Sequence, residues 1–225
     1  MSPSRRALAP VAALLVLCAT LGACASEGDV AVLDTTVVTW PAADGSTSGQ
    51  VIVAIRNDAE RPVDPDVLGN DRLTLAHLLD ADGEDLPGGD ARVQLHAVPH
   101  ILGPGETGHL LGSFEIDQPA DGVDGARVEL NTAVADPPVP VAVEGFELVE
   151  SVDGVGAIGR LEWDGSGTAV ARAIALDADG RVLGYLSTSE VLYAAGDFTM
   201  CCFPPTVTRD DIDDVVVYAD QAREE

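Results

Sequence analysis

The sequence predicts an all-β sandwich, and two observations carry this prediction. First, Asp-Gly dipeptides recur along the chain, beginning at Asp44, Asp82, Asp121, Asp124, Asp153, Asp164 and Asp179. Asp-Gly supplies the positive φ angles that tight hairpin turns require. Second, short runs rich in Val, Leu, Ile and Ala lie between these turns, while aromatic residues make up only 4% of the chain. Several short strands separated by turn signals are typical of a sandwich.

The expected strands follow one another along the chain with little room for helix. They span 30–40, 50–56, 73–79, 92–98, 107–116, 127–134, 141–149, 157–163, 168–176, 181–187, 198–203 and 214–218. Each run is apolar or alternates apolar with polar residues, as a strand with one or both faces buried does. No segment shows a sustained helical period. One short helix is predicted over 189–195, with Ser189 as its N-cap.

The N-terminal segment has the features of a signal for export. Residues 1–6 carry Arg5 and Arg6 without an acidic residue, and residues 7–21 form an apolar stretch. Small residues then precede Cys24. A basic start, an apolar stretch and small residues at the cut indicate a secretory signal peptide. The apolar stretch is shorter than the roughly 20 residues that a membrane span needs.

The last residues of this signal, Leu21-Gly22-Ala23-Cys24, resemble the lipobox of bacterial lipoproteins. The resemblance implies that residues 1–23 are removed and that Cys24 carries lipid, including palmitate. The protein would then be anchored to the extracytoplasmic face of the cell membrane, with 24–29 as a short linker. Two alternatives stay open: acylation at Cys18, which bulky Leu17 disfavours, and a cleaved signal without lipid.

The charge of the chain narrows the class of partner. The sequence has 38 acidic residues and 12 arginines, without lysine, and a net charge of −26. Such acidity keeps a protein soluble and repels nucleic acids and anionic lipid surfaces. We therefore expect no nucleic-acid partner, and we interpret the acidity as a solvated surface.

A weak internal repeat suggests two domains. Residues 79–83, Leu-Asp-Ala-Asp-Gly, recur at 176–180, and each copy follows an apolar run. A Pro-rich link at 136–140 separates the two copies. Such a link is stiff and extended. The sequence thus predicts β-sandwich domains over 30–136 and 141–220, with one larger sandwich as the alternative.

Three short motifs resemble the FxLYD-type immunoglobulin-like repeat. They are a strand that ends in Asn57, a strand at 75–79 that runs into an Asp-containing turn, and a Gly-Pro-Gly-Glu turn at 103–106. The resemblance covers about 50–114, with a poorer echo at 157–203. It implies two immunoglobulin-like sandwiches in tandem on an extracytoplasmic lipoprotein that binds rather than catalyses.

Adjacent cysteines form the most conspicuous candidate site. If Cys18 leaves with the signal and Cys24 carries lipid, Cys201 and Cys202 are the remaining thiols. In an oxidising compartment they are expected to form a vicinal disulfide, with two unpaired thiols as an alternative. With Met200 they could instead bind Cu(I), a soft metal that prefers sulfur ligands. Further ligands would have to come from His77, His96, His100 and His109.

Motifs for catalysis are missing from the sequence. It contains neither a G-x-S-x-G nucleophile elbow nor a P-loop nor a dinucleotide fingerprint. We therefore expect a non-catalytic binding or scaffolding lipoprotein without a cofactor, whose partner is an envelope protein or a cell-wall component. The alternative is a copper-binding or redox accessory lipoprotein that uses Met200, Cys201 and Cys202. A hydrolase of an unrecognised kind is the least favoured hypothesis.

Overall fold

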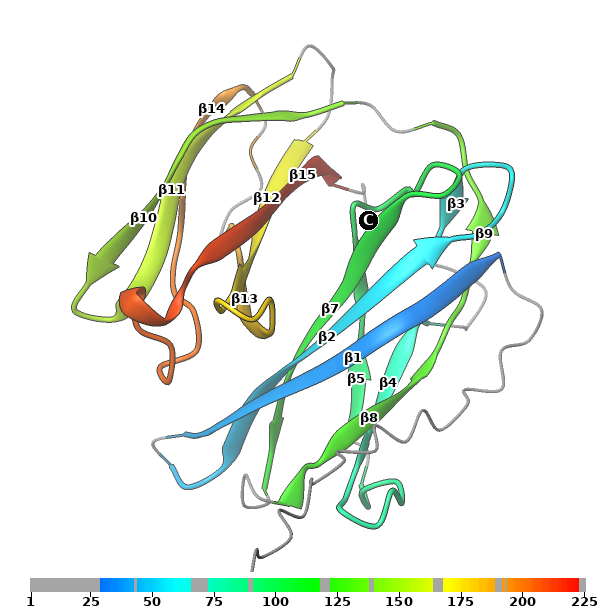
Figure 1. Cartoon of the computed structure of the whole chain (residues 1–225), viewed down its shortest axis with the longest axis vertical. Coiled ribbons are helices and arrows are strands. Elements are labelled where there is room, and N and C mark those ends of the chain that lie inside the picture. Colours follow the sequence, from blue (N-terminus) through cyan, green and yellow to red (C-terminus); the bar gives the residue numbers. More distant parts are fainter. Residues whose placement is uncertain are drawn as a thin grey trace, which may run out of the picture.

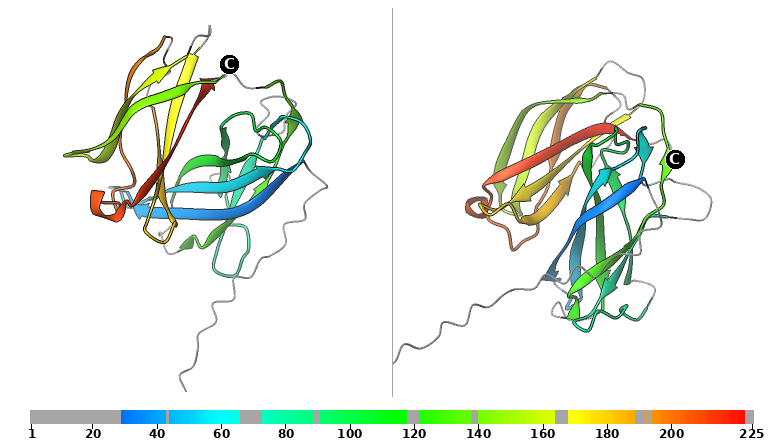
Figure 2. Two further views of the ribbon diagram at one scale, coloured as in Figure 1. Left: turned by 45° about the horizontal axis from the view of Figure 1, so that its top comes forward. Right: turned by 45° about the vertical axis from the view of Figure 1, so that its right-hand side comes forward.

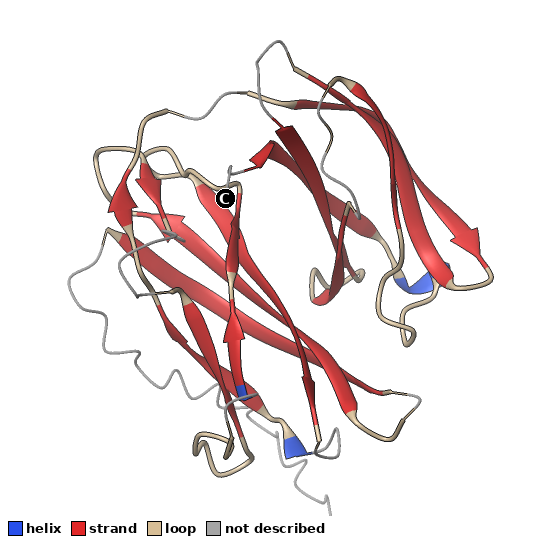
Figure 3. Ribbon diagram, turned by 180° about the vertical axis from the view of Figure 1, so that it is seen from behind, coloured by secondary structure: helices blue, strands red, loops and turns tan. Residues whose placement is uncertain are grey.

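The computed structural model describes residues 29–222, apart from 43, 66–72, 89–90, 118–121, 138–139, 164–167, 189–191 and 193. Within this part of the chain the secondary structure is almost entirely antiparallel β-strand (Figure 1). The predicted all-β sandwich fold is confirmed. The helical segments drawn in blue in Figure 3 are short, and one of them is a 3-10 turn, η3 (Arg209–Asp211).

The N-terminal half, residues 30–134, consists of two main sheets around one core. The sheet orders are β1-β2-β7-β6 and β5-β4-β8, and a small pair, β3-β9, lies beside them. The strands are β1 (Val30–Pro41), β2 (Thr47–Asn57), β3 (Val63–Asp64), β4 (Leu75–Leu79), β5 (Arg92–Gln94), β6 (His96–Val98), β7 (Thr107–Ile116), β8 (Gly125–Glu129) and β9 (Ala133–Val134). Side chains from both main sheets fill the core, including Val53, Leu78 and Leu110.

The C-terminal half, residues 142–222, also consists of two sheets around a core of its own. The sheet orders are β10-β11-β14 and β13-β12-β15. The strands are β10 (Ala142–Ser151), β11 (Gly154–Glu162), β12 (Thr168–Leu176), β13 (Val182–Ser187), β14 (Gly196–Met200) and β15 (Asp214–Ala222). Leu161 and Leu186 lie in this core with two phenylalanines, Phe198 and Phe203.

The two halves share one strand topology. In chain order, β1, β2, β4, β5, β7 and β8 pair with one another as β10, β11, β12, β13, β14 and β15 do. The Leu-Asp-Ala-Asp-Gly segments occupy the equivalent turns after β4 and β12. Each half also places a phenylalanine opposite an inward-facing glycine on the neighbouring strand: Phe114 opposite Gly49, and Phe198 opposite Gly159. This correspondence extends the repeat seen in the sequence from one turn to a whole sheet pattern.

The four sheets are stacked as layers, with the two halves in contact (Figure 1). Sheet β1-β2-β7-β6 of the first half packs on sheet β13-β12-β15 of the second through a separate apolar cluster: Ile52, Val98, Leu111 and Ile174, each 2% exposed or less. We call this contact the joint. Among the described residues, every strand pair lies within one half, so side chains rather than sheet hydrogen bonds hold the joint.

Burial on two faces explains the continuous apolar runs of the inner sheets. In β2 the residues from Gly49 to Val53 are all buried, and β12 shows two runs of three buried residues. In contrast, β10 lies in an outer sheet and contains only half-buried and exposed residues. A strand covered on both faces loses the apolar–polar alternation of a strand that faces water on one side.

The predicted elements differ from the structure at four places. The strand expected at 127–134 divides, because β8 ends at Glu129 and pairs with β4, whereas β9 pairs with β3. The expected strand at 92–98 divides at Leu95, because β5 pairs with β4 and β6 pairs with β7 in the other sheet. The strand expected at 198–203 ends at Met200. The helix prediction at 189–195 is wrong where it can be judged: Leu192 forms a β-bridge with Ala169, and residues 189–191 and 193 lie outside the described residues.

Candidate functional sites

The predicted lipid-attachment residue, Cys24, lies outside the described residues, as do Cys18 and the whole predicted signal peptide. The described chain begins at Asp29, immediately before β1. A search of the described residues for a helix long and apolar enough to cross a membrane found none.

Cys201 and Cys202 form a disulfide directly after β14. The peptide bond between them is cis. Cys201 is exposed and Cys202 is half-buried, while both flanking residues are buried: Met200 is 1% exposed and Phe203 is 3% exposed. The Phe203 N–H donates a hydrogen bond of 2.9 Å to the Val155 carbonyl of the neighbouring strand. The disulfide is therefore held on the surface between two anchored core side chains.

The three proposed copper ligands do not form a metal-binding set in this arrangement. Met200 points into the core of the C-terminal half, whereas Cys201 lies on the surface. The sulfur atoms of Cys201 and Cys202 are bonded to each other, so neither is available as a thiolate ligand. Across the described ranges, no group of three or more His, Cys, Asp or Glu side chains is placed to hold a metal ion.

The four histidines divide between two places. His77 in β4 has its Nε2 3.5 Å from Glu129 and its Nδ1 3.8 Å from Asp85. The other three, His96, His100 and His109, lie on or beside strands β6 and β7, which contribute to the joint. The disulfide segment belongs to the other half of the chain.

The Asp-Ala-Asp-Gly segments form two copies of one hydrogen-bonded turn. Asp80 Oδ1 accepts from the N–H groups of residues 82 and 84 at 2.9 and 3.0 Å. Asp177 Oδ1 accepts in the same way from residues 179 and 181 at 2.9 and 2.8 Å. The Oδ1 atom of the first aspartate in each segment thus binds the backbone of its own turn, which makes this aspartate a turn-forming residue.

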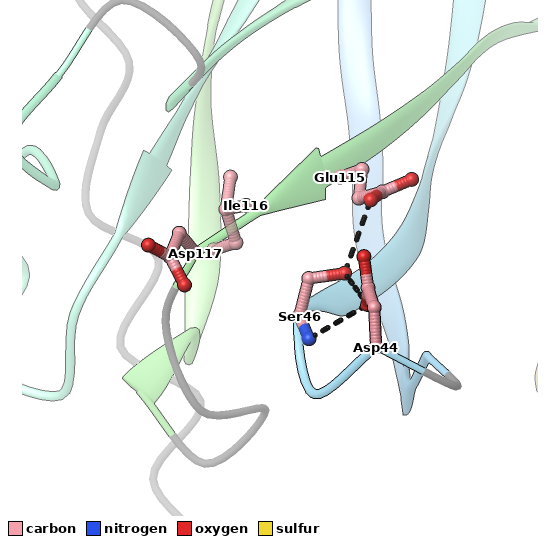
Figure 4. A pocket seen from close by; sticks show the side chains of 5 residues that line it. All are labelled: Asp44, Ser46, Glu115, Ile116 and Asp117. Atoms are coloured by element: carbon pink, nitrogen blue, oxygen red, sulfur yellow. Dashed lines mark hydrogen bonds between the residues drawn. The ribbon is translucent and has the colours of Figure 1, made fainter.

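An acidic pocket lies where the β1–β2 turn meets the end of β7 (Figure 4). The hydroxyl of Ser46 is 2.7 Å from Asp44 Oδ1 and 3.1 Å from Glu115 Oε1. Hydrogen bonds from the Ser46 backbone and then its side chain lower the pKa of Asp44. Ile116 and Asp117 complete the lining. The described lining residues include carboxylates but neither His nor Lys, and the lowered pKa of Asp44 makes that carboxylate a weak base toward the Ser46 hydroxyl.

The joint contains an interlocked set of polar contacts between the halves. The side-chain amide of Gln50 in β2 donates to the Tyr185 carbonyl at 3.0 Å and accepts from the Tyr185 N–H at 2.9 Å. It thereby pairs with the backbone of the edge strand β13. The Tyr185 hydroxyl lies 2.7 Å from Ser113 Oγ, and the Tyr218 hydroxyl lies 2.9 Å from His109 Nδ1.

A charged group lies at the edge of the joint. The His100 N–H donates a 2.8 Å hydrogen bond to Asp220 Oδ2. The other carboxylate oxygen of Asp220 lies 3.7 Å from the His100 ring and 3.8 Å from Arg172. Asp220 is only 7% exposed.

The joint was not predicted from the sequence. The one sequence feature that could have indicated it is the pair of runs at 50–56 and 168–176, which are apolar on both strand faces.

No protein-family model matches the chain, and neither a curated protein nor a solved structure matches it. The lipobox and the FxLYD-like motifs therefore stay predictions from the residues.

Two parts of the FxLYD-like motif contact each other in the structure: Asn57 at the end of β2 and the turn at 103–106. Asn57 is fully buried, its side-chain amide donates to the Arg61 and Leu102 carbonyls, and its backbone pairs with the turn at Gly105 and Glu106.

Proposed function

We propose that the protein is exported, is held on the extracytoplasmic face of the membrane by lipid on Cys24, and acts as a non-catalytic binding or scaffolding module. The observation that carries this proposal is the lipobox at 21–24 followed within a few residues by a β-sandwich body. Sandwich sheets and loops are common binding surfaces, and a rigid body presents them with little ordering cost.

The arrangement of the two halves supports a display role. Figures 1 and 2 place the first residues of β1 and the turn between β10 and β11 at opposite ends of the molecule. Under the proposal, the start of β1 faces the membrane. The far end then carries Val152, a fully exposed apolar residue, and the exposed Cys201. An envelope protein or a cell-wall component would be the partner.

The anchor is tested by fractionating cells that produce the wild-type chain or Cys24→Ala. We expect the wild type in the membrane fraction and the variant in the soluble extracytoplasmic fraction, because a covalent lipid is the anchor. Cys18→Ala is the matched control and should stay with the membrane. Retention of Cys24→Ala on the membrane would refute lipid attachment at this residue.

The binding role is tested by mild crosslinking in cells, with Val152→Asp as the comparison. If the far end of the molecule binds a partner, the wild type should give one defined crosslinked product. Val152→Asp should lower the yield of this product, since a charge opposes burial of the contact. Leu33→Asp, an exposed apolar position on β1, is the control. A wild-type protein that crosslinks to nothing reproducible would contradict the proposal.

A redox accessory role is the second candidate, and the exposed Cys201–Cys202 disulfide favours it. Exchange requires a thiolate to reach one of the two sulfurs. Mass spectrometry of the native protein after incubation with dithiothreitol, followed by alkylation, measures this directly. Reduction of the native protein supports the role, and copper uptake can then be measured with Cu(I) added. If the disulfide is reduced only after the protein unfolds, both the redox role and copper binding by these cysteines are excluded.

A further inference from the structure

The joint combines a small apolar centre with titratable groups. In the described part of the chain, its buried apolar side chains are Ile52, Val98, Leu111 and Ile174, and partly buried ones pack against them: Val38, Leu176, Val182, Tyr185 and Tyr218. Around them lie the Gln50–Tyr185 pair and the contact of His109 with Tyr218. Polar contacts thus lie directly beside the apolar cluster, where a buried group that gains an unpaired charge costs more than its hydrogen bond contributes.

Histidine is concentrated on the side of the joint that the first half supplies. His109 lies on the same face of β7 as Leu111, since residues two apart on a strand share a face. His96 shares its face with Val98 in the same way. His100 binds Asp220 of the second half. Two of the four histidines, His100 and His109, therefore contact the second half, and His96 lies on the same sheet face as Val98 of the joint.

Among the described residues, the charged and titratable groups on the elements around His109 come from six elements. Tyr218 of β15 contacts the His109 ring directly. The others are Asp220 from β15, Arg172 from β12, Tyr185 from β13, Glu106 from the turn before β7, His96 and His100 in and just after β6, and the Arg56–Asp58 pair at the end of β2. Asp220 already faces Arg172 and His100, so it is not free to neutralise a new cation on His109.

The sign of the pH effect follows from burial. Removal from water lowers the pKa of His109 below 6.5, because desolvation disfavours the charged ring. An open joint returns the ring to water and to its ordinary pKa, so the open form binds the proton more tightly. Closure is therefore fully favoured above pH 6.5 and weakens as the pH falls below it.

We propose that the joint between the two halves is a pH-responsive contact, which opens reversibly in acid when His109 takes up a proton. On opening, each half retains its own core, because these cores are apolar clusters separate from the joint, while the C-terminal half loses the stabilisation that Ile174 contributes there. Opening would expose Ile52, Leu111 and Ile174 and would change the spacing between the anchored end and the far end of the molecule.

Small-angle X-ray scattering of the purified full chain at about pH 7.5 and about pH 5 tests the proposal. We expect a larger radius of gyration in acid, unchanged β-sheet circular dichroism, and full reversal on return to neutral pH. His109→Gln keeps a hydrogen-bonding group toward Tyr218 but does not titrate, so it should stay compact at both pH values. His77→Gln, outside the joint, should behave as the wild type.

A wild-type radius of gyration that does not change with pH overturns the proposal, as does acid opening of His109→Gln at the wild-type midpoint. If His109→Gln fails to close at neutral pH, hydrogen exchange on the wild type decides. After correction for intrinsic rates, the amides of Tyr185 and His100, which donate across the joint to Gln50 and Asp220, should lose protection in acid while those of β4 and β11 keep it. Equal loss at the joint and in both strands would mean unfolding and would overturn the proposal.

Discussion

The two halves of the molecule follow the same strand topology but fill their cores differently. The N-terminal half fills its core with large aliphatic side chains, among them Ile55, Leu78 and Leu110, all 0% exposed. In the C-terminal half, the strand equivalent to β4 is β12, and it turns four alanines toward the core: Ala169, Ala171, Ala173 and Ala175. The same topology is thus compatible with two different distributions of apolar volume.

The larger side chains of β12 point the other way, into the joint. Ile174 is fully buried there, and Leu176 packs against the same cluster. Both halves bury apolar side chains in the joint, but the C-terminal half has alanines on β12 where the N-terminal half has larger aliphatic side chains in its own core. Since burying an Ile or Leu side chain contributes roughly 1.5–3 kcal/mol, we infer that the C-terminal half, with less apolar volume in its own core, depends on the joint more than the N-terminal half does.

The largest expected effect is on the self-contained core. Leu110→Ala, at a fully buried position of β7, should lower the free energy of unfolding by about 3–4 kcal/mol, because it removes buried methyl groups and leaves a cavity. Leu73→Ala, at a 38% exposed position, is the control and should cost less than about 1 kcal/mol. Urea unfolding measures both. Equal losses would show that the core of this half is not its main source of stability.

A smaller effect is expected at the joint. Ile174→Ala should lower the free energy of unfolding by about 2–3 kcal/mol and should separate the transitions of the two halves, with the C-terminal half unfolding first. Ile158→Ala, in the same half but 38% exposed on the outer sheet, controls for loss of the methyl groups alone. A single transition in Ile174→Ala, at the midpoint of the control, would argue against dependence on the joint.

The shared Gly–Phe contact should respond alike in both halves. A Cβ at Gly49 would lie 2.2 Å from the Phe114 ring, and one at Gly159 would lie 2.6 Å from the Phe198 ring. Gly49→Ala and Gly159→Ala should each cost about 1–3 kcal/mol through displacement of the ring. Gly125→Ala, where an added Cβ meets nothing within 4 Å, is the control. If thermal unfolding shows an unchanged midpoint temperature for one of the two variants, the two Gly–Phe contacts are not equivalent.

The two aspartate turns give the smallest effect. Asp80→Ala and Asp177→Ala each remove a carboxylate that accepts two backbone N–H groups on the surface. Each should cost about 1 kcal/mol, because water replaces part of the lost bonding. Asp82→Ala and Asp179→Ala are matched controls within the same turns. Calorimetry measures the loss of stability in each variant. If the control variants lose as much as Asp80→Ala and Asp177→Ala, the first aspartate is not the residue that stabilises the turn.

Local patterns in the sequence predicted the strands well where a turn signal bounded them. The strands expected at 107–116 and 168–176 have the observed bounds. Prediction failed where a tertiary contact decides the outcome: at Leu95 one apolar run serves two sheets, and at Leu192 the chain pairs with Ala169.

The candidate sites show the same division between local and distant information. Adjacent Cys201 and Cys202 could be identified as a pair from the sequence alone. The contacts of Gln50 with Tyr185 and of His109 with Tyr218 join residues more than 100 positions apart. Without knowledge of how the halves stack, neither histidine nor tyrosine carries a local signal for such a contact.

The most direct test of the account is the stability of each half alone. Residues 29–136 and 141–222, produced separately, should differ: the first should unfold cooperatively in urea, and the second should be much less stable than it is in the whole chain. Mixing the two at high concentration should restore protection of β12 in hydrogen exchange. A C-terminal half that is as stable alone as in the whole chain would contradict the inferred dependence on the joint.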